Sequence, residues 1–144
     1  MRLTAAQQKT LQALIERILP SDNGVGAKEA NVMGYVEWVT KQTFFRDREE
    51  LVVEGLEFIN SISIHLWQEP LTACSPAQQD ATIRTLAEVP NLSCYRFLRC
   101  VINMSLAGFL CDPKYGGNRG EVGWKYMGFE LNPWRRISDS DGQS

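Results

Sequence analysis

The sequence has few of the residues that enzymes commonly use for catalysis. Only one of its 144 residues is a histidine, His65, so no metal site with several histidine ligands is possible. No G-x-S-x-G motif occurs, and no serine or cysteine has an identifiable base beside it in the sequence. His65 lies in the apolar run 62–67, where a lone histidine is more often a hydrogen-bonded core or boundary residue than a general base. We therefore expect no catalytic residue and no metal ligand in this chain.

Long hydrophobic runs and a strong net charge are also absent. No run of about 18 apolar residues occurs, so we expect no direct membrane insertion. The net charge of −2 gives no general attraction to nucleic acid. The first residues, MRLTAAQQ, contain no apolar signal-peptide core. We expect a periplasmic protein if a leader has been removed or if a partner carries one, and a cytoplasmic protein otherwise.

The cysteine and glycine patterns match no common cofactor site. The four cysteines, Cys74, Cys94, Cys100 and Cys111, contain no C-x-x-C pair and no common zinc or iron–sulfur spacing. Free, mostly buried thiols are favoured, and a disulfide between two of them stays open. The glycine cluster 116–120 lacks the G-x-G-x-x-G spacing and the lysine of a phosphate-binding loop. We expect a tight turn there, with Asn118 and the glycines in left-handed conformations, and no cofactor in this chain.

Helical patterns fill most of the remaining sequence. Thr4 and Gln7 form a capping box that precedes a core-facing stripe of leucine and isoleucine ending at Pro20. Further helices are predicted over 27–42, over 47–67, from a Ser75 cap to a point before Pro90, and over 93–110. The fifth helix is the most apolar, so it is expected at the centre of a single all-α bundle of about five helices. Core-facing positions outside the first helix are expected to include Val32, Tyr35, Val36, Val39, Val52, Leu56, Ile59, Ile62 or Ser63, Leu66, Phe97, Val101, Leu106, Phe109 and Leu110.

A glycine- and aromatic-rich arm follows these helices. We interpret 1–144 as one domain, with a helical core over 1–110, an ordered irregular arm over 111–136 and a frayed polar tail over 137–144. Glycine permits positive φ and close backbone approach, and aromatic side chains bring large contact areas. The arm therefore either covers the domain's own core or contacts a partner, and we favour the partner. The predicted contacts are Tyr115, Gly116, Gly117, Asn118, Trp124, Lys125, Tyr126, Phe129 and Trp134.

Three segments resemble one known family. The run 112–129, DPKYGGNRGEVGWKYMGF, closely resembles the signature of the gluconate 2-dehydrogenase subunit 3 family. The segments ILPSD (18–22) and GAKEANVMGYVEWV (26–39) are similar to that family too. The resemblance implies a small, helical, non-catalytic subunit of a membrane-associated or periplasmic sugar or polyol dehydrogenase. It also implies that the partner is a large flavoprotein of the glucose–methanol–choline (GMC) oxidoreductase type, which carries the FAD and oxidises the sugar. Many such complexes include a cytochrome c subunit, and the small subunit is thought to assist maturation and export.

Two alternatives of other classes remain at this point. One is a stand-alone small helical enzyme that uses His65 or a cysteine. The other is a self-associating helical protein whose aromatic arm exchanges between copies. A search for bound flavin or sugar oxidation in the isolated chain tests the first alternative, and its mass in solution tests the second.

Overall fold

The computed structural model describes residues 3–21 and 24–128. These residues form α-helices and short 3₁₀ segments and contain no strand, which confirms the predicted all-α fold. None of the helices in these ranges is long and apolar enough to cross a membrane. The α-helices are α1 (Ala5–Ile18), α2 (Val32–Val39), α3 (Glu49–Trp67), α4 (Pro76–Glu88), α5 (Leu92–Leu110) and α6 (Val122–Met127). The 3₁₀ segments are η1 (Thr43–Arg48), η2 (Leu71–Ala73), η3 (Pro113–Tyr115) and η4 (Arg119–Glu121).

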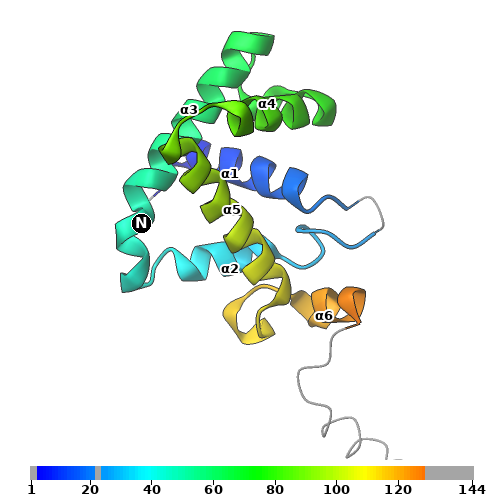
Figure 1. Cartoon of the computed structure of the whole chain (residues 1–144). Coiled ribbons are helices and arrows are strands. Elements are labelled where there is room, and N and C mark those ends of the chain that lie inside the picture. The colour runs from blue at the N-terminus through cyan, green and yellow to red at the C-terminus, as the bar shows by residue number, and fades with distance from the viewer. Residues whose placement is uncertain (1–2, 22–23, 129–144) are drawn as a thin grey trace, which may run out of the picture.

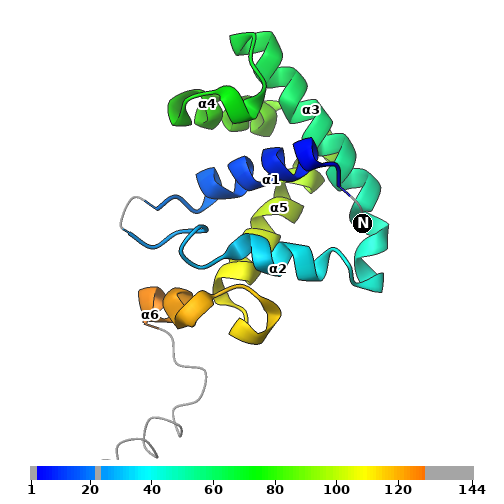
Figure 2. The ribbon, with the colours of Figure 1, turned by 180° about the vertical axis from the view of Figure 1, so that it is seen from behind.

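Helix α5 runs through the middle of the molecule, as its apolar sequence predicts. It starts near α3 and α4 at one end and finishes near α2 and α6 at the other (Figure 1). The view from behind shows α1 crossing α5 on that side (Figure 2). One core joins these helices. Its fully buried side chains include Leu11, Leu14, Ile15, Val32, Val52, Leu56, Ile59, Leu71, Leu86, Phe97 and Val101.

Both serine or threonine caps work as the sequence predicts. The Thr4 hydroxyl accepts from the backbone N–H of Gln7 at 3.1 Å, and the Gln7 side chain accepts from the N–H of Thr4 at 3.0 Å. Ser75 and Gln78 form the same reciprocal pair at the start of α4, with distances of 3.2 and 2.9 Å. Each box satisfies backbone donors that have no partner inside the helix. The two helix starts are thus fixed by local chemistry.

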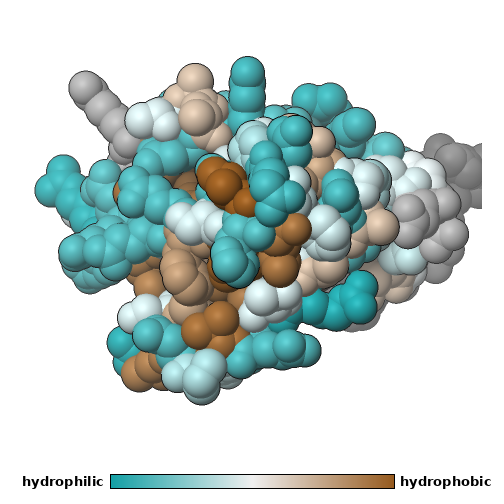
Figure 3. Space-filling view, turned by 90° about the horizontal axis from the view of Figure 1, so that it is seen from above, coloured by the Kyte–Doolittle hydropathy of each residue, from teal (hydrophilic) through white to brown (hydrophobic). Residues whose placement is uncertain are grey.

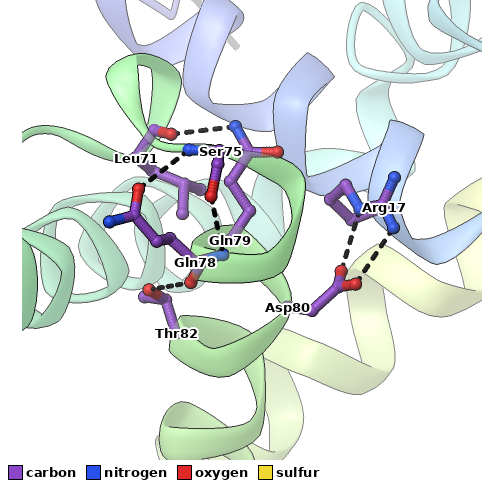
Figure 4. Close-up of polar contacts among 7 residues, drawn as sticks. All are labelled: Arg17, Leu71, Ser75, Gln78, Gln79, Asp80 and Thr82. Atoms are coloured by element: carbon purple, nitrogen blue, oxygen red, sulfur yellow. Dashed lines mark hydrogen bonds and ion pairs between the residues drawn. The ribbon is translucent and has the colours of Figure 1, made fainter.

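An ion pair and a close crossing hold the helices at the α3–α4 end. Arg17 of α1 donates to the Asp80 carboxylate of α4 through Nε and Nη2, at 2.8 and 3.0 Å (Figure 4). Helices α3 and α5 cross at Gly55, where a Cβ atom would overlap the ring of Phe97. The absence of a side chain at Gly55 therefore lets a large aromatic ring fill the crossing.

Several expectations about helix boundaries and burial were wrong. Helix α2 begins at Val32 and not at 27, because Asn31 takes a left-handed conformation with φ of 53° and the residues before it form turns. Leu66, Leu106 and Leu110 were expected to face the core but are exposed, because no other described helix covers their sides of α3 and α5. His65, expected at the core or its boundary, is also exposed.

All four cysteines are free thiols in the structure. Cys74 and Cys100 are buried, and Cys94 and Cys111 are half-buried. Burial raises the pKa of the Cys100 and Cys111 thiols. A raised pKa keeps these two thiols protonated and so lowers their nucleophilicity at neutral pH.

Candidate partner-binding surface

The chain turns back after α5, and the returning segment caps the carboxyl end of that helix. The last four carbonyls of an α-helix have no partner within the helix. Here the backbone N–H of Asn118 donates to the carbonyl oxygen of Gly108 at 2.8 Å. The indole Nε1 of Trp124 donates to the carbonyl of Leu110 at 2.7 Å, and the Asn118 Nδ2 donates to that of Cys111 at 2.8 Å. Residues 112–124 therefore complete the end of α5.

Asn118 organises this capping segment. Its side chain is 0% exposed, and its Oδ1 accepts from the backbone N–H groups of Gly123 at 2.8 Å and Trp124 at 3.3 Å. Its φ of 46° is left-handed, a conformation that asparagine tolerates better than most residues with a Cβ. Gly116 and Gly120 also have positive φ, as predicted for this turn, whereas Gly117 does not.

The capping segment is also joined to the residues before α2. The Asn31 side chain donates to the carbonyl of Gly116, and the backbone N–H of Arg119 donates to the carbonyl of Ala30, both at 3.0 Å. The segments 26–39 and 112–128 are far apart in the sequence but lie against each other in the fold. Their two sequence patterns therefore describe the two halves of one junction.

Glycine is needed in this junction because backbones approach very closely. A Cβ atom at Gly117 would overlap the carbonyl oxygen of Gly108, and one at Gly123 would overlap the carbonyl oxygen of Phe109. Any larger residue at either position would push the capping segment away from α5. The glycines of the arm thus serve close packing within the chain.

The aromatic residues of the arm divide into inner and outer ones. Trp124 is only 9% exposed and bonds to α5, so its indole has a role within the chain. The centroid of the Tyr115 ring lies 4.6 Å from that of the Trp38 ring on α2. The Nζ of Lys114 lies 4.9 Å from the centroid of the Tyr115 ring. Tyr126, by contrast, is 53% exposed.

We give the name α5–α6 patch to the exposed residues on the last turns of α5 and on α6, which are Leu106, Leu110, Lys125, Tyr126 and Met127. All five side chains are exposed. Helix α6 lies beside the carboxyl end of α5, and the Tyr126 ring meets the buried Phe109 ring edge-on at 6.0 Å. Exposed aromatic and apolar side chains next to a cation are typical of protein–protein interfaces.

The family model described as gluconate 2-dehydrogenase subunit 3 matches residues 5–130 of this chain. The match covers most of the 144 residues and includes both halves of the junction. The chain belongs to the gluconate 2-dehydrogenase subunit 3 family. No curated protein and no solved structure gives a match.

In this subunit 3 chain, the predicted contact residues have different positions. Gly117, Asn118 and Trp124 are buried, Tyr115 and Gly116 are half-buried, and Lys125 and Tyr126 are exposed. Phe129 and Trp134 lie outside the described residues. Contact with a partner stays a prediction for the whole set. In this conformation, only Lys125 and Tyr126 among its described members present largely open side chains.

Sequence reasoning missed other residues of the subunit 3 junction and of the α5–α6 patch. Leu106 and Leu110 were assigned to the core, because an apolar residue in an apolar helix gives no sign of exposure. Asn31 and Gly108 were not singled out, although a glycine within an apolar helix signals a close backbone approach.

In the described part of the chain, no three histidine, cysteine, aspartate or glutamate side chains are grouped so that they could hold a metal ion.

Proposed function

We propose that this chain is the non-catalytic small subunit of an FAD-dependent sugar or polyol dehydrogenase. In this proposal, the large GMC-type subunit holds the FAD and oxidises the sugar. In complexes that include a cytochrome c subunit, that subunit is a further partner. The small subunit stabilises the large one or assists its maturation and export. Membership of the subunit 3 family supports a place in a dehydrogenase complex.

The observation that carries the proposed contact is the exposed α5–α6 patch on a rigid base. Asn118 and Trp124 fix α6 to α5, so Tyr126 and Met127 are held in place before a partner arrives. A surface that is already ordered loses less entropy on binding than a flexible one. The patch is therefore suited to recognise a folded protein surface.

Binding to the folded partner alone is enough to explain a stabilising subunit. A ligand that binds only the native state stabilises it by about 2.7 kcal/mol when its concentration is 100 times its Kd. The large subunit would gain this free energy from the small subunit without any catalytic help. A large flavoprotein that folds slowly or loses FAD easily would then accumulate only in the presence of this chain.

Co-expression with the large flavoprotein subunit tests the proposal. The complex is isolated through an affinity tag on this chain. The flavin absorbance and the sugar dehydrogenase activity of the co-purified protein are then measured. Combined Tyr126→Ala and Met127→Ser substitutions are expected to weaken the complex by about 2 kcal/mol or more, the effect of losing an interface hot spot. The matched control is Tyr95→Ala, because Tyr95 is 60% exposed near the other end of α5.

Equal recovery of flavin and activity with the double variant and the control would contradict the assigned contact. Recovery of no flavoprotein with the wild-type chain would contradict the proposed function itself. Bound flavin or sugar oxidation in the isolated chain would instead support the stand-alone enzyme.

A further inference from the structure

A pocket of about 200 Å³ lies between α2, η1 and α5. Most of its lining is apolar or aromatic and comes from Tyr35, Val39, Phe44, Phe45, Met104 and Ala107. Phe44 is 60% exposed although it lines the pocket, so a ligand that covers its ring removes apolar surface from water. A cavity of about 150 Å³ can hold benzene, so this pocket has room for one aromatic ring and a small polar group.

The lining also contains one cation and one amide. Arg48, at the end of η1, is the charged residue, and Asn103 of α5 provides the amide. Burial raises the pKa of the Cys100 thiol in the pocket wall, and the positive charge of Arg48 acts against that shift. The guanidinium therefore lies close enough to the wall to act on the thiol. Within the described ranges, the ion pair found joins Arg17 to Asp80, so no carboxylate lies at ion-pair distance from Arg48.

We propose that this pocket binds a small aromatic carboxylate. The carboxylate accepts hydrogen bonds from the Arg48 guanidinium, whose planar N–H groups suit two oxygens at once, and from the Asn103 amide. The ring packs against Phe44 and Met104, because aromatic pairs and contacts between sulfur and an aromatic ring are favourable. A sugar acid suits the pocket less well, since its hydroxyl groups lie against apolar side chains without hydrogen-bond partners.

The open apolar surface at the α3–α4 end of the molecule differs in charge. Apolar side chains remain open among polar ones when the molecule is seen from that end (Figure 3). A larger groove of about 380 Å³ lies between α3, α4 and α5, and its charged lining residue is Glu54. A carboxylate in that groove is repelled by Glu54. The charge of the lining therefore favours the pocket beside Arg48 as the site for an anion.

This site does not depend on the proposed dehydrogenase partner. All of its lining side chains belong to this chain, so the isolated chain is expected to bind the ligand. A failure to recover a flavoprotein with this chain contradicts the proposed function and leaves the pocket unaffected. A failure to bind the ligand contradicts the site and leaves the proposed function unaffected.

Methionine methyl NMR of the full chain tests the site, with benzoate as the probe. Met104 lines the pocket, whereas Met33 and Met127 do not and serve as internal controls. Benzoate is expected to shift the Met104 methyl signal saturably, with a Kd of about 1 mM, in line with the affinity of very small ligands. The signals of Met33 and Met127 are expected to change little.

Two comparisons test the role of the charge. Benzamide keeps the ring but lacks the negative charge, and it is expected to bind at least about tenfold more weakly than benzoate. Arg48→Gln is expected to weaken benzoate binding at least about tenfold, because the charge-assisted hydrogen bonds are lost. Arg46→Gln is the matched control, since Arg46 is an exposed arginine of η1 that does not line the pocket.

Far-UV circular dichroism shows whether both arginine variants keep the helical fold. The benzamide comparison uses the wild type, so it decides the question even where Arg48→Gln alters the fold. The proposal is overturned if the Met104 signal does not shift saturably or if benzamide binds as tightly as benzoate. It is also overturned if the folded Arg48→Gln variant binds benzoate as tightly as Arg46→Gln.

Discussion

Replacing Asn118 by alanine tests whether this residue holds the capping segment on α5. The substitution removes the Nδ2 bond to the carbonyl of Cys111 and both Oδ1 bonds to the backbone N–H groups of Gly123 and Trp124. Gly123 and Trp124 are buried, so water cannot readily replace the lost acceptor. Alanine also lacks asparagine's tolerance for a left-handed backbone.

The expected cost follows from these losses. A buried polar group left without a partner costs about 1–3 kcal/mol, so losing the partners of two such N–H groups costs about 2–6 kcal/mol. Alanine adopts the left-handed conformation less readily than asparagine, which adds to this cost. We therefore expect Asn118→Ala to lower the free energy of unfolding by at least about 3 kcal/mol, a large part of the 5–15 kcal/mol typical of a domain.

Urea unfolding followed by circular dichroism measures this change. Asn118→Gly serves as a partner variant, because it loses the same hydrogen bonds but adopts positive φ freely; it is expected to be about 1 kcal/mol more stable than Asn118→Ala. Asn103→Ala, at an exposed asparagine on α5, is the control and is expected to stay within about 0.5 kcal/mol of the wild type. A loss below about 1 kcal/mol for Asn118→Ala would refute the reasoning.

Three further predictions use the same unfolding measurement. Trp124→Phe keeps most of the buried ring but loses the indole hydrogen bond, so a loss of about 1 kcal/mol is expected; no loss would contradict the role of that bond. Ser75→Ala removes the cap of α4 and is expected to cost about 1 kcal/mol, whereas Ser93→Ala, at an exposed serine that makes no cap, is the matched control. The Arg17 hydrogen bond lowers the pKa of Asp80 in the folded protein. The pair therefore stabilises the fold at pH values above the pKa that Asp80 has in the unfolded chain, and this stabilisation is lost as the pH falls through the lower pKa of the folded state. Asp80→Asn is expected to cost about 0.5 kcal/mol at neutral pH, because the pair is partly exposed, and the difference should vanish in acid; a difference independent of pH would contradict it.

Local chemistry explains which parts of the fold were predictable. The capping boxes at Thr4 and Ser75 depend on residues three positions away, so the sequence shows them directly. The start of α2 depends instead on Asn31, whose side chain reaches Gly116, 85 positions later. A helical pattern over 27–42 cannot show that contact, and the predicted helix was accordingly too long.

The arm shows why the candidate surface was harder to predict than the fold. A tryptophan among glycines suits both an interface and a cap on a nearby helix, because the side chain offers a large apolar area and one donor. Trp124 is used for the cap, and the donor is satisfied by Leu110. The turn geometry at Asn118 was predictable, since asparagine beside glycine favours left-handed conformations. The exposure of Leu106 was not predictable, because burial depends on which helices pack nearby.

The junction between 26–39 and 112–128 also bears on how the protein is made. During synthesis, α5 emerges from the ribosome before the residues that complete its carboxyl end. The last-turn carbonyls stay hydrated until Asn118 and Trp124 have also emerged, and only then can Arg119 reach Ala30. A nascent or prematurely terminated product that stops within α5 lacks this closure. Translation must therefore continue past Trp124 before the end of α5 is closed and α6 can present its outer residues.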